Sequence, residues 1–293
     1  MAVTNPHLLI VGCGDIGTRV GCGLSAHGWH ISALRRRPEK LPDMFQAFAG
    51  DYTTGEGLVS LAKVKPDYLL FTPTPASRDA QGYRRGFSGA MGLIAETAAA
   101  ESLRGGVLVS STRVYAETSG NWVDETSALA TNDPFASAII EAEKIFLAQI
   151  SGATVFRASG LYDGSPQGHL ASRIAQGVFS QTGARYSNRI HRDDLATAIE
   201  FAFLQAEANN PLDGIFVASD DLPAPMSDVE RWLAEQIGVP YAPGAAASGG
   251  GERGNRRCDN SRLKAAGFTF RYPDYRAGYG GLKAEPGFPY DPL

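Results

Sequence analysis

The sequence predicts an α/β fold: a doubly wound parallel sheet with helices on both faces, followed by a smaller C-terminal α/β part. Short apolar runs alternate with segments of helical periodicity through the first two-thirds of the chain, as βαβ units require. A glycine-rich motif follows the first of these runs directly. After Ser159 the alternation loosens, so we place a domain boundary there. The two predicted domains are residues 1–158 and 159–293, with parts of 190–220 completing the first sheet.

The expected strands are short apolar runs that end at turn residues or at a helical segment. They are His7–Val11, His30–Leu34, Phe45–Ala49, Tyr68–Phe71, Val107–Ser110, Thr154–Arg157 and Ile215–Val217. Helices are expected between them, where apolar residues recur at helical spacing. They are a segment from Gly17 to Gly28, about Tyr83–Leu103, Ile139–Ile150, Leu195–Leu204 and Asp228–Ile237. Residues 243–254 are small and glycine-rich, which predicts a flexible loop.

Composition limits the classes of function. The 293 residues carry a formal net charge of −4 at pH 7, which gives no reason to expect a nucleic-acid partner. No apolar run is long enough for a signal peptide or a membrane span, so we expect a cytoplasmic protein without a membrane partner. Three cysteines, Cys13, Cys22 and Cys258, lack metal-ligand spacing and predict neither a disulfide framework nor a metal site. The expected partner is a small molecule.

The glycine-rich motif GCGDIG comes directly after a predicted strand and opens a predicted helix. In that context it indicates a dinucleotide site and, with it, a Rossmann fold. Gly12 allows a tight turn, Gly14 lets the backbone approach a pyrophosphate, and Gly17 allows the helix to pack closely on the strand. The pyrophosphate would bind free N–H groups at the helix N-terminus, at Asp15 and Ile16.

The end of the second predicted strand indicates which dinucleotide binds. An NAD site usually places Asp or Glu about 20 residues beyond the glycines, where it holds the ribose 2′-hydroxyl. This chain has three arginines there and no acid. The planar guanidinium suits a 2′-phosphate, so Arg35 and Arg36 predict NADP, with NAD as second choice; a solvated basic turn is the alternative. Asp51 is either an acceptor for the adenine amino group or an ordinary turn aspartate.

Four further segments, in a fixed order, carry a resemblance to a known family. They are Val107–Ala116 (VLVSSTRVYA), Val155–Tyr162 (VFRASGLY), Arg189–Leu195 (RIHRDDL), and the pair Asn260–Leu263 and Gly267–Tyr279. They resemble, in turn, the serine-bearing strand, the RxxGxY segment, the IHVDDL element and the C-terminal segment of the extended short-chain dehydrogenase/reductase superfamily. The similarity is to its NAD(P)-dependent epimerase/dehydratase branch, and within it to the atypical members.

The resemblance covers nearly the whole chain and implies a function. It implies an oxidoreductase or epimerase that acts on a nucleotide sugar or another small polar metabolite, as a monomer or a homodimer. It places Ser111 at the position of the catalytic serine or threonine, with Thr112 beside it. The residues that it implies to line the cofactor are Phe71, Thr72, Pro73 and Ser110.

The chain departs from the family at the Tyr-x-x-x-Lys pair. When Glu143 is aligned with the glutamate that follows the tyrosine, Phe135 stands at the tyrosine position and Ile139 at the lysine position. Neither side chain can transfer a proton, so another group would have to do so. The candidates are Tyr115, Tyr162, His191 and Arg157. His191 has an ordinary pKa near neutrality, although it could equally be a structural histidine.

Five arginines lie in segments that should face a substrate: Arg157, Arg173, Arg185, Arg189 and Arg192. They favour an anionic ligand such as a phosphate, with ordinary surface arginines as the alternative. Two functions therefore stay open. The chain is either an enzyme with a non-standard active site or a non-catalytic NADP-binding sensor or scaffold protein. An enzyme needs an open polar cavity beside the nicotinamide, whereas a sensor can fill that space.

Overall fold

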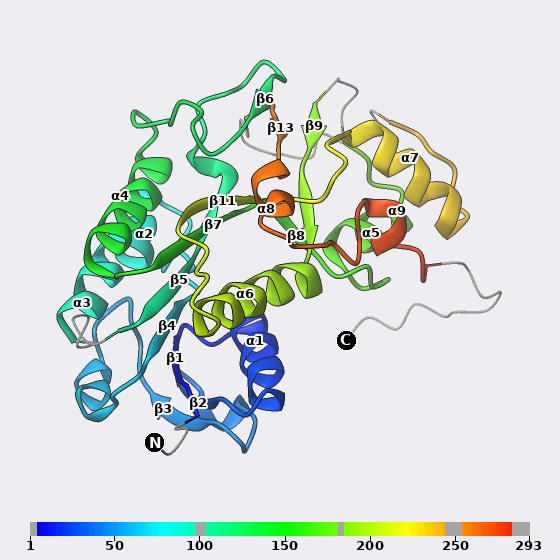
Figure 1. Cartoon of the computed structure of the whole chain (residues 1–293). Helices are drawn as coiled ribbons and strands as arrows, with labels where there is room; N and C mark the ends of the chain where they lie inside the picture. Colours follow the sequence, from blue (N-terminus) through cyan, green and yellow to red (C-terminus); the bar gives the residue numbers. More distant parts are fainter. Residues whose placement is uncertain (1–4, 98–102, 181–184, 244–253, 283–293) are drawn as a thin grey trace.

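The computed structural model (Figure 1) describes residues 5–97, 103–180, 185–243 and 254–282. Its centre is a seven-stranded sheet in the order β11-β7-β5-β4-β1-β2-β3, with every neighbouring pair parallel. The strands are β1 (His7–Val11), β2 (His30–Arg35), β3 (Gln46–Ala49), β4 (Tyr68–Phe71), β5 (Gly105–Ser111), β7 (Ala153–Ala158) and β11 (Gly214–Ala218). The strand order reverses between β1 and β4, so the predicted doubly wound sheet is confirmed.

Helices cover both faces of the sheet (Figure 1). One face carries α1 (Asp15–Ala26) and α6 (Arg192–Glu207), which pack side by side. The other carries α2 (Ala80–Arg84), the π-helical turn η3 (Arg85–Gly89), α3 (Ala90–Thr97) and α4 (Pro134–Gln149). Leu8 and Ile10 of β1 pack in the first layer, and Leu9 and Val11 pack in the second. The strand is therefore apolar throughout because both of its faces are buried.

The helices depart from the sequence prediction mainly where they begin. α4 begins before Ile139 because the Asp133 side chain accepts a hydrogen bond from the Phe135 N–H at 2.9 Å and so caps the helix. The predicted helix Tyr83–Leu103 begins at Ala80 and contains the π-helical turn. At Gly86 in that turn, a Cβ would lie 2.2 Å from the carbonyl oxygen of Thr74, so the turn passes too close to that loop for a side chain.

A smaller C-terminal part lies beside the carboxyl edge of the sheet (Figure 1). Its strands are β8 (Gly160–Tyr162), paired in parallel with β10 (Arg189–His191), and β9 (Tyr186–Ser187), paired with β12 (Ala224–Pro225). Its helices are α5 (His169–Ala175), α7 (Met226–Ile237) and α9 (Tyr275–Gly278). Side chains from all three helices, among them Ile174, Leu233 and Tyr275, form a separate buried cluster.

The remaining elements are short connections. They are η1 (Pro38–Lys40), η2 (Leu58–Lys63), η5 (Thr112–Val114), β6 (Trp122–Val123), β13 (Arg257–Cys258) and α8 (Ser261–Ala265). Residues 244–253 of the predicted glycine-rich loop lie outside the described residues. Among the helices in the described ranges, none has the length and apolar character needed to cross a membrane.

Candidate functional site

The glycine loop joins β1 to α1 at the carboxyl edge of the sheet. Gly12 has a φ of +80°, and a Cβ there would lie 2.7 Å from the carbonyl oxygen of Thr72. At Gly17 a Cβ would lie 2.9 Å from Cγ2 of Ile10, which closes that position to side chains. Gly14 is different, because a Cβ built there would have its nearest neighbour, the carbonyl oxygen of Gly12, 3.8 Å away. No side chain caps the helix after Gly14, so no described side chain accepts from its first N–H groups.

The loop after β4 lies next to the glycine loop and is hydrogen-bonded to it. The Thr72 hydroxyl donates a hydrogen bond to the carbonyl oxygen of Gly12 at 2.6 Å. The backbone N–H of Thr72 donates to the carbonyl oxygen of Val11 at 3.1 Å. The hydroxyl of Tyr52 accepts a hydrogen bond from the Thr74 N–H at 3.0 Å. Phe71, in contrast, has its side chain wholly inside the core. Tyr52 was not predicted as a site residue, because nothing in its local sequence indicates that it reaches this loop.

The residues predicted to select the cofactor lie at the ends of β2 and β3. Arg35 is half-buried and Arg36 is exposed, and neither forms an ion pair within the described ranges. Asp51 is half-buried, and its Oδ1 accepts hydrogen bonds from the N–H and hydroxyl of Thr53, at 2.9 and 2.7 Å. That oxygen therefore holds its own turn, as the alternative interpretation of Asp51 requires.

Ser111 lies at the carboxyl end of β5, half-buried, where its hydroxyl oxygen accepts the N–H of Arg113 at 3.2 Å. The carbonyl oxygen of the next residue, Thr112, accepts a hydrogen bond from the Arg256 guanidinium at 2.5 Å. Arg113 turns back over the ring of Phe135, with its guanidinium carbon 4.5 Å from the ring centroid. The structure thus brings Ser111, Thr112 and Phe135 together around one short helical turn.

A buried polar network lies behind this turn. The Ser110 hydroxyl donates to Glu143, and Arg157 donates to the same carboxylate from Nη2 at 2.8 Å. Arg157 and Glu143 are each 2% exposed. The Arg157 guanidinium also lies over the Tyr115 ring, 5.1 Å from its centroid. Ser110, Arg157 and Glu143 therefore hold β5, β7 and α4 together, and the buried Arg157 does not face a ligand as its segment suggested.

Tyr115 is a poor candidate for proton transfer on two grounds. It is 1% exposed, and its hydroxyl has no hydrogen-bond partner among the described residues. Burial raises the pKa of its hydroxyl well above the ordinary value. Tyr162 lies closer to solvent, with its ring 4.8 Å from that of Tyr279, and burial raises its pKa as well. Both phenols are therefore protonated at neutral pH.

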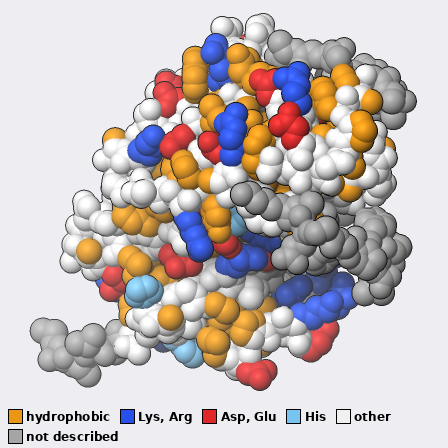
Figure 2. Space-filling model, turned by 90° about the vertical axis from the view of Figure 1, so that its right-hand side faces the viewer, with side chains coloured by type: hydrophobic (Ala, Val, Ile, Leu, Met, Phe, Trp, Pro, Cys, Tyr) orange, Lys and Arg blue, Asp and Glu red, His pale blue; other side chains and the backbone are white. Residues whose placement is uncertain are grey.

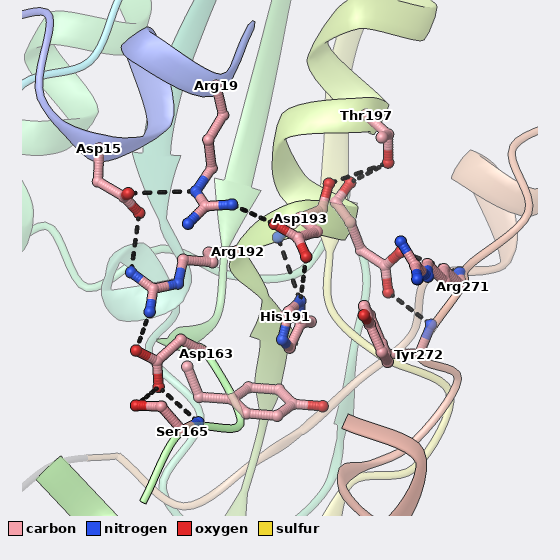
Figure 3. Close-up of polar contacts among 12 residues, drawn as sticks. Asp15, Arg19, Asp163, Ser165, His191, Arg192, Asp193, Thr197, Arg271 and Tyr272 are labelled. Atoms are coloured by element: carbon pink, nitrogen blue, oxygen red, sulfur yellow. Dashed lines mark hydrogen bonds and ion pairs between the residues drawn. The ribbon is translucent and has the colours of Figure 1, made fainter. Parts of the chain in front are cut away.

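His191 is enclosed at the N-terminus of α6 (Figure 3). Its Nδ1 accepts the N–H of Asp193 at 3.2 Å and so caps the helix. Its ring centroid is 3.9 Å from that of Tyr272, and the side chain is 6% exposed. Burial lowers its pKa, which keeps the imidazole neutral at pH 7. This arrangement is that of a capping, packed histidine.

An ion-pair chain connects the glycine loop to the C-terminal part (Figure 3). Arg192 contacts Asp15 at 3.3 Å through one nitrogen and Asp163 through another. Arg19 contacts Asp15 at 3.1 Å and also contacts Asp193. Asp15 therefore lies between two guanidinium groups at the N-terminus of α1. Arg192 stands where the IHVDDL element has valine, so this chain carries a cation beside the predicted pyrophosphate position.

A cavity of about 390 Å³ opens beside these ion pairs, between the glycine loop and the C-terminal part. The charged side chains that line it are Asp15, Asp163, Arg173, Arg189 and Arg192. Tyr162, Ser187, Met226 and Tyr279 also contribute to its wall. Figure 2 shows acidic and basic side chains meeting across the middle of this face of the molecule. The cavity is open and combines charged with apolar side chains, and neither Ser111 nor Thr112 is among its lining residues.

Comparison with solved structures identifies the family. A protein from Methylobacillus flagellatus, assigned as an NAD-dependent epimerase/dehydratase, is 31% identical over 95% of this chain and 98% of its own, with a TM-score of 0.77. The chain belongs to the NAD-dependent epimerase/dehydratase family. No family model matches the sequence, and no curated protein matches it.

Two more distant structures share the fold of this family. MoeE5, in complex with UDP-glucuronic acid and NAD, is 21% identical over 94% of this chain and 96% of its own, with a TM-score of 0.75. The human epimerase family protein SDR39U1, with NADPH, is 17% identical over 94% of this chain and 99% of its own, with a TM-score of 0.72.

Phe135 and Ile139, which the sequence comparison aligned with the Tyr-Lys pair, both lie on α4. The Phe135 ring is half-buried and meets the ring of Tyr83 edge-on, with centroids 5.0 Å apart. Ile139 is 1% exposed and belongs to the core. Tyr83 comes from α2 and was not predicted, because sequence spacing gives no indication that it meets α4.

Proposed function

We propose that this chain is an NAD(P)-dependent oxidoreductase or epimerase of the short-chain dehydrogenase type, with NADP as its preferred cofactor. Its substrate would be a nucleotide sugar or another small polar metabolite. The observation that carries the proposal is the glycine loop: two glycines are closed by neighbouring atoms, and the third has no close neighbour and precedes a helix N-terminus that no side chain caps. MoeE5 with NAD and a UDP-sugar, and SDR39U1 with NADPH, support the assignment of ligand classes.

The residues present fit a bound dinucleotide. The N–H groups of Asp15 and Ile16 would bind the pyrophosphate, and the open side of Gly14 would admit it. Arg19 and Arg192 compensate the Asp15 carboxylate, which would otherwise repel those phosphates. Arg35 and Arg36 would bind the 2′-phosphate. When bound, the nicotinamide supplies hydride transfer.

The chemical step would take place near the end of β5. Ser111 would orient the substrate oxygen, because its hydroxyl lies half-exposed at the edge where the ends of β1, β4 and β5 meet. The chain offers no Tyr-Lys pair at this point, since Phe135 and Ile139 stand there. General acid catalysis typically contributes about 10²–10⁴-fold, so we expect slow turnover of generic carbonyl substrates.

A non-catalytic sensor or scaffold is the second candidate function, and one observation favours it. Phe135 is packed against Tyr83 and Arg113, and Ile139 is buried in the core, so α4 presents packing groups where proton transfer would be needed. An open cavity next to Asp15 could admit a small polar substrate, which supports the enzyme instead. Turnover of NADPH with a panel of UDP-sugars and small carbonyl compounds distinguishes the two. A sensor would bind NADPH and leave it unoxidised with every compound.

Titration with both reduced cofactors tests the cofactor assignment. Wild-type protein should bind NADPH roughly ten- to hundredfold more tightly than NADH, because even one charge-assisted hydrogen bond to the 2′-phosphate contributes about 1.5–3 kcal/mol. Changing Arg35 and Arg36 to alanine should remove the preference and leave NADH binding nearly unchanged. Arg37→Ala, which changes the adjacent exposed arginine, is the matched control. Equal or tighter binding of NADH by the wild type contradicts the assignment.

A further inference from the structure

The loop after β4 has few backbone donors with which to fix its own position. Residues 72–76 read TPTPA, and the two prolines carry no N–H. At the two ends of the loop the N–H groups donate to the carbonyl oxygens of Val11 and Gly82, at 3.1 and 3.0 Å. Thr74 has the one N–H in between, and the hydroxyl of Tyr52 accepts it at 3.0 Å. The middle of the loop is therefore held by Tyr52.

The ring of Tyr52 also lies against the glycine loop. A Cβ on Gly12 would fall 3.1 Å from Cε1 of Tyr52, so the ring covers one side of that glycine. The ring meets that of Phe71, the last residue of β4, edge-on with centroids 5.3 Å apart. A single side chain that follows β3 thus touches the ends of both β1 and β4. A Rossmann fold binds its dinucleotide over these strand ends.

Asp51 fixes the backbone on both sides of Tyr52. Its Oδ1 accepts the N–H and the hydroxyl of Thr53, which closes a turn with Tyr52 as the middle residue. The N–H of Asp51 donates to the carbonyl oxygen of Glu56 at 2.8 Å, and its own carbonyl oxygen accepts the N–H of Gly55 at 2.9 Å. The side chain of Tyr52 therefore extends from a backbone that several hydrogen bonds hold in place.

We infer that Tyr52 is a positioning residue of the dinucleotide site, which holds the loop after β4 against the glycine loop, and that Asp51 acts through it. Each of the three N–H groups of the loop is engaged, so the loop would contact a dinucleotide through its side-chain surface. Such contacts contribute less to affinity when the loop has first to be ordered. The inference rests on the proposed function and deepens its cofactor site.

Fluorescence titration with NADPH, combined with thermal unfolding of the protein without ligand, tests this inference. Tyr52→Phe keeps the ring and removes the hydroxyl. Its dissociation constant for NADPH should rise roughly two- to tenfold, the range that one hydrogen bond contributes. Tyr52→Ala removes the ring as well, so its loss of affinity should be larger than that of Tyr52→Phe.

Tyr68→Phe is the matched control, because it removes a tyrosine hydroxyl at the opposite, amino end of β4. There the hydroxyl of Tyr68 donates to Glu207 at 2.7 Å, away from the glycine loop. Any effect of this control should appear in Tm, with the dissociation constant for NADPH unchanged. If Tyr52→Phe behaves in the same way, its hydroxyl serves stability alone and the inference is overturned.

Asp51→Ala tests whether Asp51 acts through Tyr52 or contacts the ligand itself. Removal of the acceptor that closes the turn should weaken NADPH binding several-fold. Combined with Tyr52→Phe, it should cost less than the sum of the two single losses. Additive losses would mean that Asp51 contributes independently and would overturn its assigned role. If thermal unfolding shows that Tyr52→Phe is not folded, Asp51→Ala carries the test alone, and unchanged affinity overturns the inference.

Because these titrations need no turnover, the two proposals can fail separately. If the wild type oxidises NADPH with a substrate but Tyr52→Phe binds it equally tightly, the enzyme proposal stands and this inference fails. If NADPH binding depends on Tyr52 but the wild type leaves NADPH unoxidised with every compound, this inference stands and the enzyme proposal fails. If the wild type binds no dinucleotide, both fail.

Discussion

Helices α1 and α6 contact each other at two places with opposite electrostatics. At their N-termini, Asp15 and Arg19 of α1 alternate with Arg192 and Asp193 of α6, so every charge has a partner. Further along, Glu200 of α6 lies against α1, and no cation of the described residues forms an ion pair with it. A Cβ on Gly23 would fall 2.3 Å from its Oε1, so the carboxyl group lies directly over that glycine. Burial raises the pKa of Glu200 to about 7.

The two contacts between α1 and α6 differ in whether their charged side chains have partners of opposite charge. The paired end lies beside the proposed pyrophosphate position, where a ligand would add further negative charge, so we expect the two arginines to contribute to binding. At the other contact no ligand is expected, and a single carboxyl group is instead held in a partly desolvated position. Substitutions at the first contact should therefore affect cofactor binding, and substitutions at the second should affect stability alone.

The largest effect is expected at Gly14, in front of the paired end. Gly14→Val should abolish binding of NADPH, with a loss of at least a hundredfold, because the side chain would occupy the space that the pyrophosphate needs. The protein should stay folded, since the nearest atom to a Cβ is 3.8 Å away. Gly92→Val is the control, because a Cβ at Gly92 has nothing within 4 Å. Thermal stabilisation of folded Gly14→Val by NADPH would show that the site lies elsewhere.

A smaller effect is expected at Arg192, within the paired end. Arg192→Val restores the residue of the family element but leaves Asp15 with one cation fewer. The dissociation constant for NADPH should rise roughly three- to tenfold at low salt, and the difference should shrink as salt screens it. Fluorescence titration at two salt concentrations measures this.

Two further variants sharpen the test of Arg192. Arg192→Lys keeps the charge and should bind nearly as the wild type does. If Arg192 acts by compensating Asp15, the valine substitution should cost less in an Asp15→Asn background, as a double-mutant cycle would show. Equal losses in both backgrounds contradict that role.

The smallest effect is expected at the unpaired contact, as a dependence of stability on pH. The folded-state pKa of Glu200, about 7, lies above the ordinary value of 4.5. Between these values the unfolded chain loses the proton first, so this group makes the protein less stable as pH rises through that range. Glu200→Gln should therefore raise Tm by a few degrees at pH 8 and by less at pH 5. The exposed Glu235, changed to Gln, should shift Tm at neither pH; a pH-independent shift in Glu200→Gln would contradict this origin.

The parts of the molecule that sequence could predict are those built from neighbouring residues. GCGDIG and the apolar runs specify a strand, a turn and a helix from contiguous positions, and the structure has them there. The start of α4 was missed because Asp133 caps it through a hydrogen bond that hydropathy does not register. The contacts of Tyr52 with Thr74 and of Tyr83 with Phe135 join separate elements, so no local pattern indicates them.

The arginines show the same limit more clearly. In the sequence Arg157, Arg189 and Arg192 look alike, since all three lie in family-like segments. In the structure Arg157 is in the core with Glu143, Arg192 bridges two aspartates, and Arg189 forms no ion pair with any described residue. Which partner each guanidinium meets depends on chain segments far away in sequence, and that decides whether it stabilises the fold or can receive a ligand.

The pairing of β7 with β11 has a consequence for how such a protein diversifies. Ala158 and Ala218, the last residues of the two strands, lie opposite each other, and the Ser159 N–H donates to Ala218 at 3.0 Å. The two stretches of chain that build the cavity wall therefore leave the sheet from adjacent points on one edge. Their loops can lengthen, shorten or exchange side chains while the strands beneath keep their register. A lineage can thus acquire new substrates by remodelling one rim, without rebuilding the nucleotide-binding half.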